Sequence, residues 1–424
     1  MKNIKTINLG KGINLTLIPE EKFKTNLVSI YIQRLLDKEE VTKNALLPAI
    51  IKSGSEKYPS ARDMAAHQDD LYGVSIGADT SKRGETQVIT FKIISTDEKY
   101  LDEKIFKPVV EFLDEVVNHP LVIDGGFKEE YVEIEKQSLR HRIESVINDK
   151  GRYAIERARE EMFKNERYGI SDLGYLEDID KINGKDLYKH YQQIMKTSPI
   201  DIVVEGNFNE EEIVNIISNG FNFDREEIIE IPRAEFKKKI EAVKTIEEDM
   251  DITQGKLVMG YRCNVDYKDE YRYYSLLVGS SVLGGGPHSK LFMNLREKES
   301  LCYYIYSSIE KYKTSMFISS GIERDNYDKT VKLIKEQLEN LKDGKISEEE
   351  LLNSKSALIS SLKTIKDSIG GASDFYFSQH MGQTNTTVER IIEIIEKIMV
   401  EDIVDAVKDI ELDTIYFLSN SKEA

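Results

Sequence analysis

The sequence predicts an α+β protein of two similar halves, each with helices packed on a mainly antiparallel sheet. The first observation is length, because 424 residues suffice for two domains of roughly 200 residues each. The second is an order of predicted strands and helices that occurs twice. The third is local similarity: residues 71–93 parallel residues 301–322, and residues 127–139 parallel residues 346–358. Each pair occupies the same place in its half.

In the first half, alternation of apolar and polar residues predicts strands, and apolar residues at helical spacing predict helices. The apolar segment 44–53 is predicted as a short helix with Pro48 in or near its first turn. The predicted strands are two short ones within 4–19, then 26–34, 74–81, 85–95 and 200–205. The predicted helices are 44–53, 60–71, 100–117, 127–146, 152–164, 184–196 and 210–218.

After the first half the composition changes. Residues 224–250 are dense in charge and contain Pro232, so we expect a linker on the surface. The same order of elements then begins again. The predicted strands are 253–262, 314–321 and 414–419, and the predicted helices are 271–283, 327–341, 347–362, 373–381 and 387–399. The expected domains are an N-terminal half over 1–228, a linker over 229–250 and a C-terminal half over 251–424.

Composition excludes some partners. The formal net charge is −17 and the pI is about 5.1, which disfavours nucleic acid and anionic membranes and mildly favours basic peptides. The two cysteines, Cys263 and Cys302, cannot form a disulfide framework. No signal peptide or apolar stretch of about 18 residues is found. We therefore expect a soluble protein of the cytoplasm.

The most informative stretch is residues 283–308, LGGGPHSKLFMNLREKESLCYYIYSS. Three glycines are expected to form an uncrowded turn, followed by a helix that Ser289 caps and then a strand from Leu301. Arg296 would end the helix and Tyr303 would start the strand, so their donors could converge on one backbone carbonyl. The alternative from pattern alone is an ordinary turn, a surface charge and a core aromatic. The spacing of a phosphate-binding loop is absent.

The run LGGG-x-x-S-x-LF-x-x-LREK-x-x-L-x-Y resembles the C-terminal signature of the pitrilysin/insulinase clan of zinc metallopeptidases, which includes the mitochondrial processing peptidases. The resemblance covers essentially the whole chain and implies the same two-half shape. In that clan an Arg/Tyr pair hydrogen-bonds substrate backbone inside a closed chamber. The pair corresponds to Arg296 and Tyr303, and the loop Gly284, Gly285 and Gly286 would line the chamber. Ser300 departs from the family, which usually has Gly there.

Active members of the clan carry HxxEH, with two histidines as zinc ligands and a Glu as general base. Aligned on Gly54 and Ser55, the chain has Ala45 and Ala49 at the histidine positions and Pro48 at the Glu position. The third ligand position falls at Gln137, with Glu133 and Glu135 close enough to leave the register open. No two of the six histidines lie within five residues of each other. We therefore predict no catalytic residue, no metal and no cofactor in this chain, with zinc only in a partner chain.

Further runs, including LLPAIIKSGSEKYPSARD and FKEEYVEIEKQSLRHRI, resemble a bacterial subgroup of the clan, the YfmF-type proteins. That group is named for an association with modification of elongation factor P and usually occurs beside a zinc-bearing homologue, which implies such a partner here. The first hypothesis is a zinc-less subunit that binds peptide backbone and completes an active peptidase with that partner. The alternative is a homodimeric peptide-binding or scaffold protein without a proteolytic role.

Overall fold

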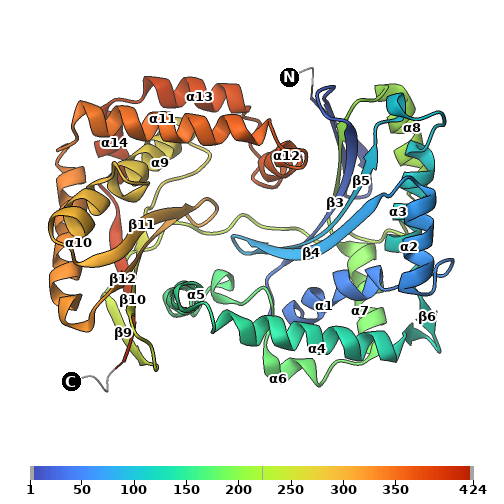
Figure 1. The fold of residues 1–424 in the computed structure, drawn as a ribbon, viewed down its shortest axis with the longest axis horizontal. Helices are drawn as coiled ribbons and strands as arrows, with labels where there is room; N and C mark the ends of the chain where they lie inside the picture. The colour runs from blue at the N-terminus through green and yellow to red at the C-terminus, as the bar shows by residue number, and fades with distance from the viewer. Residues whose placement is uncertain (1–3, 222, 421–424) are drawn as a thin grey trace. The chain divides into compact units, whose positions relative to one another are not determined.

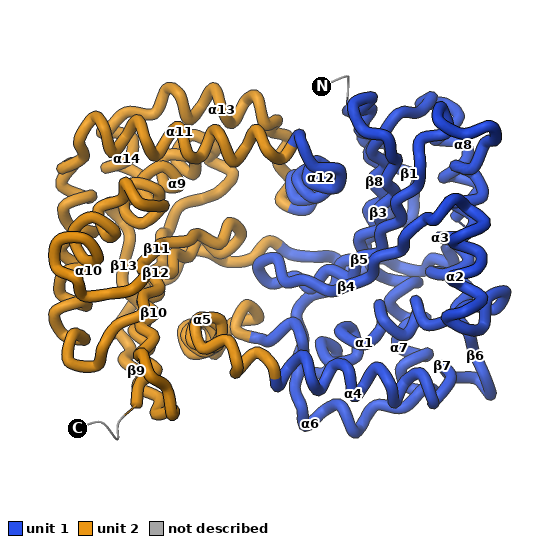
Figure 2. Tube along the Cα trace, in the orientation of Figure 1, with its two compact units in different colours: residues 1–144, 170–232, 366–381 blue, residues 145–169, 233–365, 382–424 orange. Residues whose placement is uncertain are grey.

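The computed structural model describes residues 4–221 and 223–420, which form two compact units. Unit 1 comprises residues 1–144, 170–232 and 366–381, and unit 2 comprises residues 145–169, 233–365 and 382–424 (Figure 2). Each unit contains a mainly antiparallel sheet packed with helices, which confirms the predicted fold class.

Unit 1 is built on a six-stranded sheet in the order β1-β2-β8-β3-β5-β4, in which only β2 and β8 pair in parallel (Figure 1). Its strands are β1 (Lys5–Gly10), β2 (Ile13–Pro19), β3 (Thr25–Leu35), β4 (Ser75–Arg83), β5 (Thr86–Thr96) and β8 (Ile200–Gly206), with β6 (Val122–Ile123) and β7 (Gly126–Phe127) as a separate hairpin. Its helices are α1 (Val41–Lys52), α2 (Ala61–Asp70), α3 (Phe106–Asn118), α4 (Glu129–Val146), α6 (Leu176–Ile179), α7 (Gly184–Thr197), α8 (Glu210–Gly220) and α12 (Gly371–Met381).

Unit 2 is built on a five-stranded sheet in the order β11-β12-β10-β13-β9, in which only β13 and β9 pair in parallel. Its strands are β9 (Lys244–Asp249), β10 (Gly255–Arg262), β11 (Cys302–Glu310), β12 (Ser315–Ile322) and β13 (Glu411–Ser419). Its helices are α5 (Lys150–Met162), α9 (Glu270–Gly284), a π-helix (Phe292–Lys298), α10 (Tyr327–Lys342), α11 (Glu348–Ile365), α13 (Val388–Lys397) and α14 (Val400–Val407).

Each unit contains one helix whose sequence lies in the other half of the chain. Helix α12 packs on the unit 1 sheet, where Phe377 stacks on Tyr31 of β3 with 4.0 Å between ring centroids. Helix α5 packs on β10 and β13 of unit 2, where Met162 meets Gly260. Strand β3 is consequently buried on both faces, and Figure 1 shows α3 and α12 on opposite sides of its sheet. The compact units are therefore discontinuous in sequence, in contrast to the continuous halves expected.

Two predicted elements need correction. The expected linker over 229–250 contains a strand, β9, which pairs with β13 in register from Lys244 to Asp249. Lys244, Glu247 and Asp249 are exposed at the sheet edge, whereas Glu248 is half-buried and accepts hydrogen bonds from Tyr153 and Tyr416. This charged composition hides the strand in the sequence. The helix expected over 100–117 begins only at Phe106, because Pro108 is accommodated in a first turn but not in a helix interior.

Candidate functional site

The positions of the missing zinc motif lie in the middle of helix α1. Ala45 is 3 % exposed and belongs to the main apolar core of unit 1, Pro48 is buried, and Ala49 is half-buried. The helix begins at Val41, so Pro48 lies well inside it rather than in its first turn as predicted. Proline has no N–H to donate to the carbonyl of Asn44 four residues earlier, so the helix lacks one backbone hydrogen bond at this point.

The side chains at these positions do not fit a zinc ion. Alanine offers no lone pair, and proline can neither coordinate a metal nor carry a proton. On α4, Gln137 is exposed and Glu133 accepts a hydrogen bond from Lys136 at 2.6 Å. In the part of the chain that the structure describes, no three His, Cys, Asp or Glu side chains are placed to hold a metal ion. These residues therefore provide no metal-assisted step.

Arg296 is carried by a π-helix rather than the α-helix expected from the spacing. Ser289 precedes Lys290 and Leu291, the helical residues that lead into the π-helix; its hydroxyl donates to the Gly286 carbonyl at 2.6 Å and accepts a weak hydrogen bond of 3.5 Å from the Phe292 N–H. The Arg296 guanidinium lies 4.5 Å from the centroid of the Phe292 ring, and its side chain is 41 % exposed. Because π-helices are rare and occur often at functional sites, this segment is a candidate for function.

Tyr303 lies at a β-bulge at the start of β11. Cys302 pairs with Ile322 and Tyr304 pairs with Gly321, so Tyr303 is the extra residue that has no partner on β12. A bulge turns its extra side chain away from the regular alternation, and Tyr303 is 80 % exposed. Tyr303 is therefore not the core aromatic of the alternative reading.

The turn before Tyr303 is strained at Ser300, whose φ is +51°. This left-handed backbone conformation favours glycine, because a Cβ crowds the following carbonyl oxygen. The family's usual residue at this position is thus the one that the backbone prefers. Ser300 occupies the same conformation at a cost in conformational energy.

Arg296 and Tyr303 lie near the same point of unit 2. The π-helix packs against β11, and the N–H of Leu301 donates to the carbonyl of Leu295 at 2.9 Å. Burial raises the pKa of the Cys302 thiol, while a hydrogen bond with Ser320 and the positive charge of Arg296 act to lower it. Arg296 is thus close enough to affect the residue before Tyr303. Within the described residues no hydrogen bond joins the pair, and the Arg296 Nε atom lies 4.0 Å from the Oε1 atom of Glu297.

The three glycines do not form the uncrowded turn that was expected. Gly284 is the buried last residue of α9, and a Cβ at this position would lie 2.7 Å from the backbone N of Ser307 on β11. Only glycine allows the end of α9 to approach this strand so closely. Gly285 and Gly286 then lead away from the helix towards the π-helix. Whether the three line a chamber stays a prediction.

A cleft beside β11 was not predicted from the sequence. It has a volume of about 770 Å³ and is lined by Tyr304 and Tyr306 of β11, Lys256 of β10 and, around the start of α5, residues 148–152, Ile155 and Glu156. The two tyrosine rings lie 6.0 Å apart, and the Lys256 ammonium lies 5.5 Å from the Tyr304 ring centroid. The sequence signal that could have indicated this cleft is the pair of tyrosines two residues apart, Tyr304 and Tyr306. The contribution of α5 was not visible because its sequence is more than 100 residues away.

Comparison with known proteins gives consistent matches. The family model described as the peptidase M16 inactive domain matches residues 181–358. The chain is 35 % identical, over 97 % of both chains, to a Bacillus subtilis protein named probable inactive metalloprotease YmfF. It is 22 % identical to a Helicobacter pylori protein named non-peptidase homolog YmxG, over 92 % of this chain and 87 % of that relative.

Solved structures agree with these matches. A conserved protein from Enterococcus faecalis V583 superposes with a TM-score of 0.92 at 32 % identity over the whole of both chains. A peptidase M16 inactive domain from Pseudomonas fluorescens gives a TM-score of 0.77 at 17 % identity, over 99 % of this chain and 98 % of that one. Within residues 4–221 and 223–420, no helix combines the length and apolar character needed to cross a bilayer.

Proposed function

The chain belongs to the M16 peptidase family as an inactive homologue, and from this premise we propose that it is the substrate-binding, zinc-less subunit of a two-chain peptidase. In this proposal Arg296 and Tyr303 hydrogen-bond the backbone of a bound peptide. A second, homologous chain supplies the zinc ion and the general base. The chain itself needs no cofactor.

The exposure of Tyr303 is the observation that carries the proposal. A large aromatic side chain that is 80 % exposed contributes little to the core, so packing does not account for it. Its position on a bulge beside an exposed Arg296 gives two donors in one region of unit 2. Such donors can bind a peptide carbonyl and polarise it if it is the one to be cleaved.

Strand β11 also favours an extended peptide. It is the edge strand of its sheet and pairs only with β12, which leaves its other row of backbone N–H and C=O groups for an added strand. The cleft lined by Tyr304, Tyr306 and Lys256 lies beside the same strand and can take side chains of that peptide. Backbone pairing gives affinity without demanding a particular sequence.

The need for a partner follows from the side chains of α1. Ala45, Pro48 and Ala49 supply neither a zinc ligand nor a base, so hydrolysis requires those groups from another chain. Among the relatives, Bacillus subtilis has both the probable inactive metalloprotease YmfF and an uncharacterized zinc protease YmxG. We propose that this chain and such a homologue work together in the cytoplasm, where its two free cysteines stay reduced.

The test is reconstitution. The purified chain is mixed with a zinc-bearing homologue from the same genome, and cleavage of a quenched fluorescent peptide library is measured for each chain and for the mixture. We expect cleavage only in the mixture and a loss of tenfold or more with Arg296→Ala, since hydrogen bonds to charged groups contribute about 1.5–3 kcal/mol. The matched control is Lys298→Ala, which removes a neighbouring exposed cation of the same π-helix and should leave the rate unchanged.

Two outcomes would contradict the proposal. Cleavage by the chain alone, abolished by chelator, would show that it has its own metal site. A tight homodimer that binds peptides but ignores the homologue would support the alternative of a non-proteolytic scaffold.

A further inference from the structure

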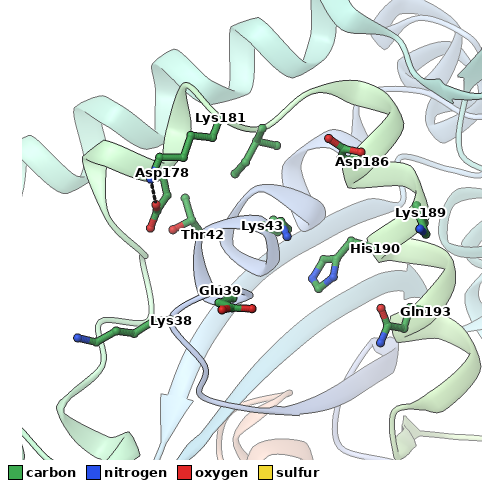
Figure 3. Close-up of a pocket in the computed structure, with 11 residues that line it drawn as sticks. Lys38, Glu39, Thr42, Lys43, Asp178, Lys181, Asp186, Lys189, His190 and Gln193 are labelled. Atoms are coloured by element: carbon green, nitrogen blue, oxygen red, sulfur yellow. Dashed lines mark hydrogen bonds and ion pairs between the residues drawn. The ribbon is translucent and has the colours of Figure 1, made fainter.

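A cavity of about 560 Å³ lies in unit 1 between the start of α1 and the helices α6 and α7 (Figure 3). Thr42 and Lys43 of α1 line one wall, and Lys189, His190 and Gln193 of α7 line another. A volume of this size is typical of small-molecule sites, which span about 300–1,000 Å³. The cavity is made only of unit 1 residues and does not include Ala45, Pro48 or Ala49.

His190 is held in one tautomer by two buried amides. The Gln87 Nε2 atom donates to the carbonyl oxygens of Val41 at 3.3 Å and Asp172 at 2.7 Å, which can only accept. This fixes the Gln87 Oε1 atom as the acceptor of the Asn44 Nδ2 group at 2.9 Å. The Asn44 Oδ1 atom must then accept from His190 Nε2 at 2.8 Å. The proton is on Nε2, and Nδ1 carries a free lone pair.

This lone pair is available to a ligand. His190 is only 7 % exposed, and its Nδ1 atom has no hydrogen-bond partner within the described ranges of the chain. Figure 3 shows the ring on the cavity side of α7, between Lys43 and Gln193. Burial, with smaller effects of Lys43 and Arg34, lowers the pKa of the imidazole to about 3, so the ring stays neutral near pH 7.

The charges around the ring favour an anion. Lys181 is paired with Asp178 at 2.8 Å, whereas Lys43 and Lys189 form no ion pair among the residues described, and the carboxylates of Glu39 and Asp186 also line the cavity. The lining carries four lysines and three carboxylates, so it has a small positive excess in a chain of net charge −17. A metal ion is not the ligand expected here, since no three coordinating side chains gather in the described structure.

We propose that this cavity binds a small organic anion that carries an N–H or O–H donor close to its anionic group. The anionic group binds Lys43 and Lys189, and the donor binds the Nδ1 atom of His190. Gln193 offers an amide to a further polar group of the ligand. Two sources share this chemistry: the C-terminal residue of a peptide, with its amide N–H and carboxylate, and a sugar phosphate, with its hydroxyls. The inference does not depend on the proposed peptidase role.

The test uses the full-length chain labelled with ¹⁵N-histidine and observes the His190 imidazole by NMR. The probes are N-acetylglycine and ribose 5-phosphate, which carry a donor, and acetate and sulfate, which do not. We expect a proton on Nε2 without ligand, and a shift of the Nδ1 resonance with at least one donor-bearing probe, which identifies the source. Acetate and sulfate should bind about tenfold more weakly, as expected for one lost hydrogen bond.

Two variants test the charges. Lys43→Met should weaken binding of the active probe about tenfold, in line with a lost hydrogen bond to a charged group. Lys185→Met is the matched control, because Lys185 is exposed on α7, the helix that carries Lys189 and His190, but does not line the cavity. A proton found on Nδ1, no Nδ1 shift with either donor-bearing probe at millimolar concentration, or equal effects of the two variants would overturn the proposal.

Discussion

The exchange of helices between the halves can be tested at one partly buried carboxylate. Glu166 follows α5, in a segment that comes from the first half of the sequence and lies in unit 2. Its carboxylate accepts hydrogen bonds from Arg262 at 2.7 and 3.1 Å and lies 2.8 Å from the Lys313 Nζ atom. The side chains of Arg262 and Lys313 are each 1 % exposed. The change to make is Glu166→Gln, which preserves size and removes the charge.

Two arguments give the size of the effect. Removing one partner from a buried ion pair costs about 3–5 kcal/mol, and the lower end of this range applies here because Arg262 keeps its second partner, Asp413, at 3.0 Å. Burial alone would raise the pKa of the Glu166 carboxyl, but the hydrogen bonds from Arg262, Lys313 and Lys238 outweigh it and lower the pKa to about 2. The difference from 4.5, at 1.36 kcal/mol per pH unit, is about 3 kcal/mol. We therefore expect Glu166→Gln to lower the free energy of unfolding of unit 2 by about 3 kcal/mol.

The sign of the pH dependence follows from the lowered pKa. A carboxyl whose pKa is lower in the folded state stabilises the protein above its unfolded-state pKa. The contribution of Glu166 is thus complete above about pH 4.5 and is lost as the pH falls towards about 2. In the Gln variant, the stability of unit 2 should depend less on pH across this range.

The assay is urea unfolding followed by far-UV circular dichroism, because the chain contains no tryptophan. Unfolding is recorded at pH 7 and in steps below pH 4.5. The matched control in the same unit is Glu393→Gln, which removes one partner of an exposed pair with Arg390 and should cost less than about 0.5 kcal/mol. Equal midpoints for Glu166→Gln and the wild type at pH 7 would refute the reasoning.

Three further predictions concern the exchanged helix α12 and the candidate site. Phe377→Ala removes a fully buried ring that stacks on Tyr31, so unit 1 should lose about 3–5 kcal/mol of unfolding free energy in urea; a loss below 1 kcal/mol would mean that α12 is not docked there. Tyr303→Phe should leave the urea midpoint unchanged but lower peptide cleavage by the reconstituted mixture about tenfold, whereas Tyr271→Phe, at an exposed tyrosine of α9 outside the cleft, serves as the control; unchanged cleavage would exclude the Tyr303 hydroxyl from binding. Ser300→Gly should raise stability by about 0.5–1 kcal/mol, because relief of the positive φ exceeds the entropy cost of glycine; a lower urea midpoint would contradict this.

The sequence was sufficient to predict those elements whose periodicity is strong. Strands such as β3, β5 and β10 follow from alternation and β-branched residues, and the repeated order of elements gave the two halves. The sheet on which a helix docks is not encoded in its amphipathic pattern, so the positions of α5 and α12 could not be predicted. Strand β9 was missed because KTIEED, at a sheet edge, has the composition of a linker.

The candidate residues of the site were predicted from motifs of fixed spacing, and their roles stay predictions. The run from Gly284 to Tyr303 gave the Arg/Tyr pair, and the distance from Gly54 gave the three positions of the lost zinc motif. The π-helix could not be predicted, since apolar residues at spacings of three and four indicate a helix without specifying i→i+5 hydrogen bonds. The hydrogen bonds that connect Gln87, Asn44 and His190 join three segments distant in sequence, and no local sequence pattern indicates them.

The structure explains the residues at the lost zinc-motif positions and the residues of the Arg/Tyr pair in different ways. Ala45 is explained by packing, since it fills a place in an apolar core where a histidine ring would have to be accommodated and hydrogen-bonded. Tyr303 is not explained by packing: its ring is largely in solvent, its residue interrupts the pairing of β11 with β12, and the turn before it holds Ser300 in an unfavourable conformation. A fold selected for stability alone would have a regular strand here. The strained turn, the bulge and the exposed phenol together therefore argue that this end of β11 binds a ligand.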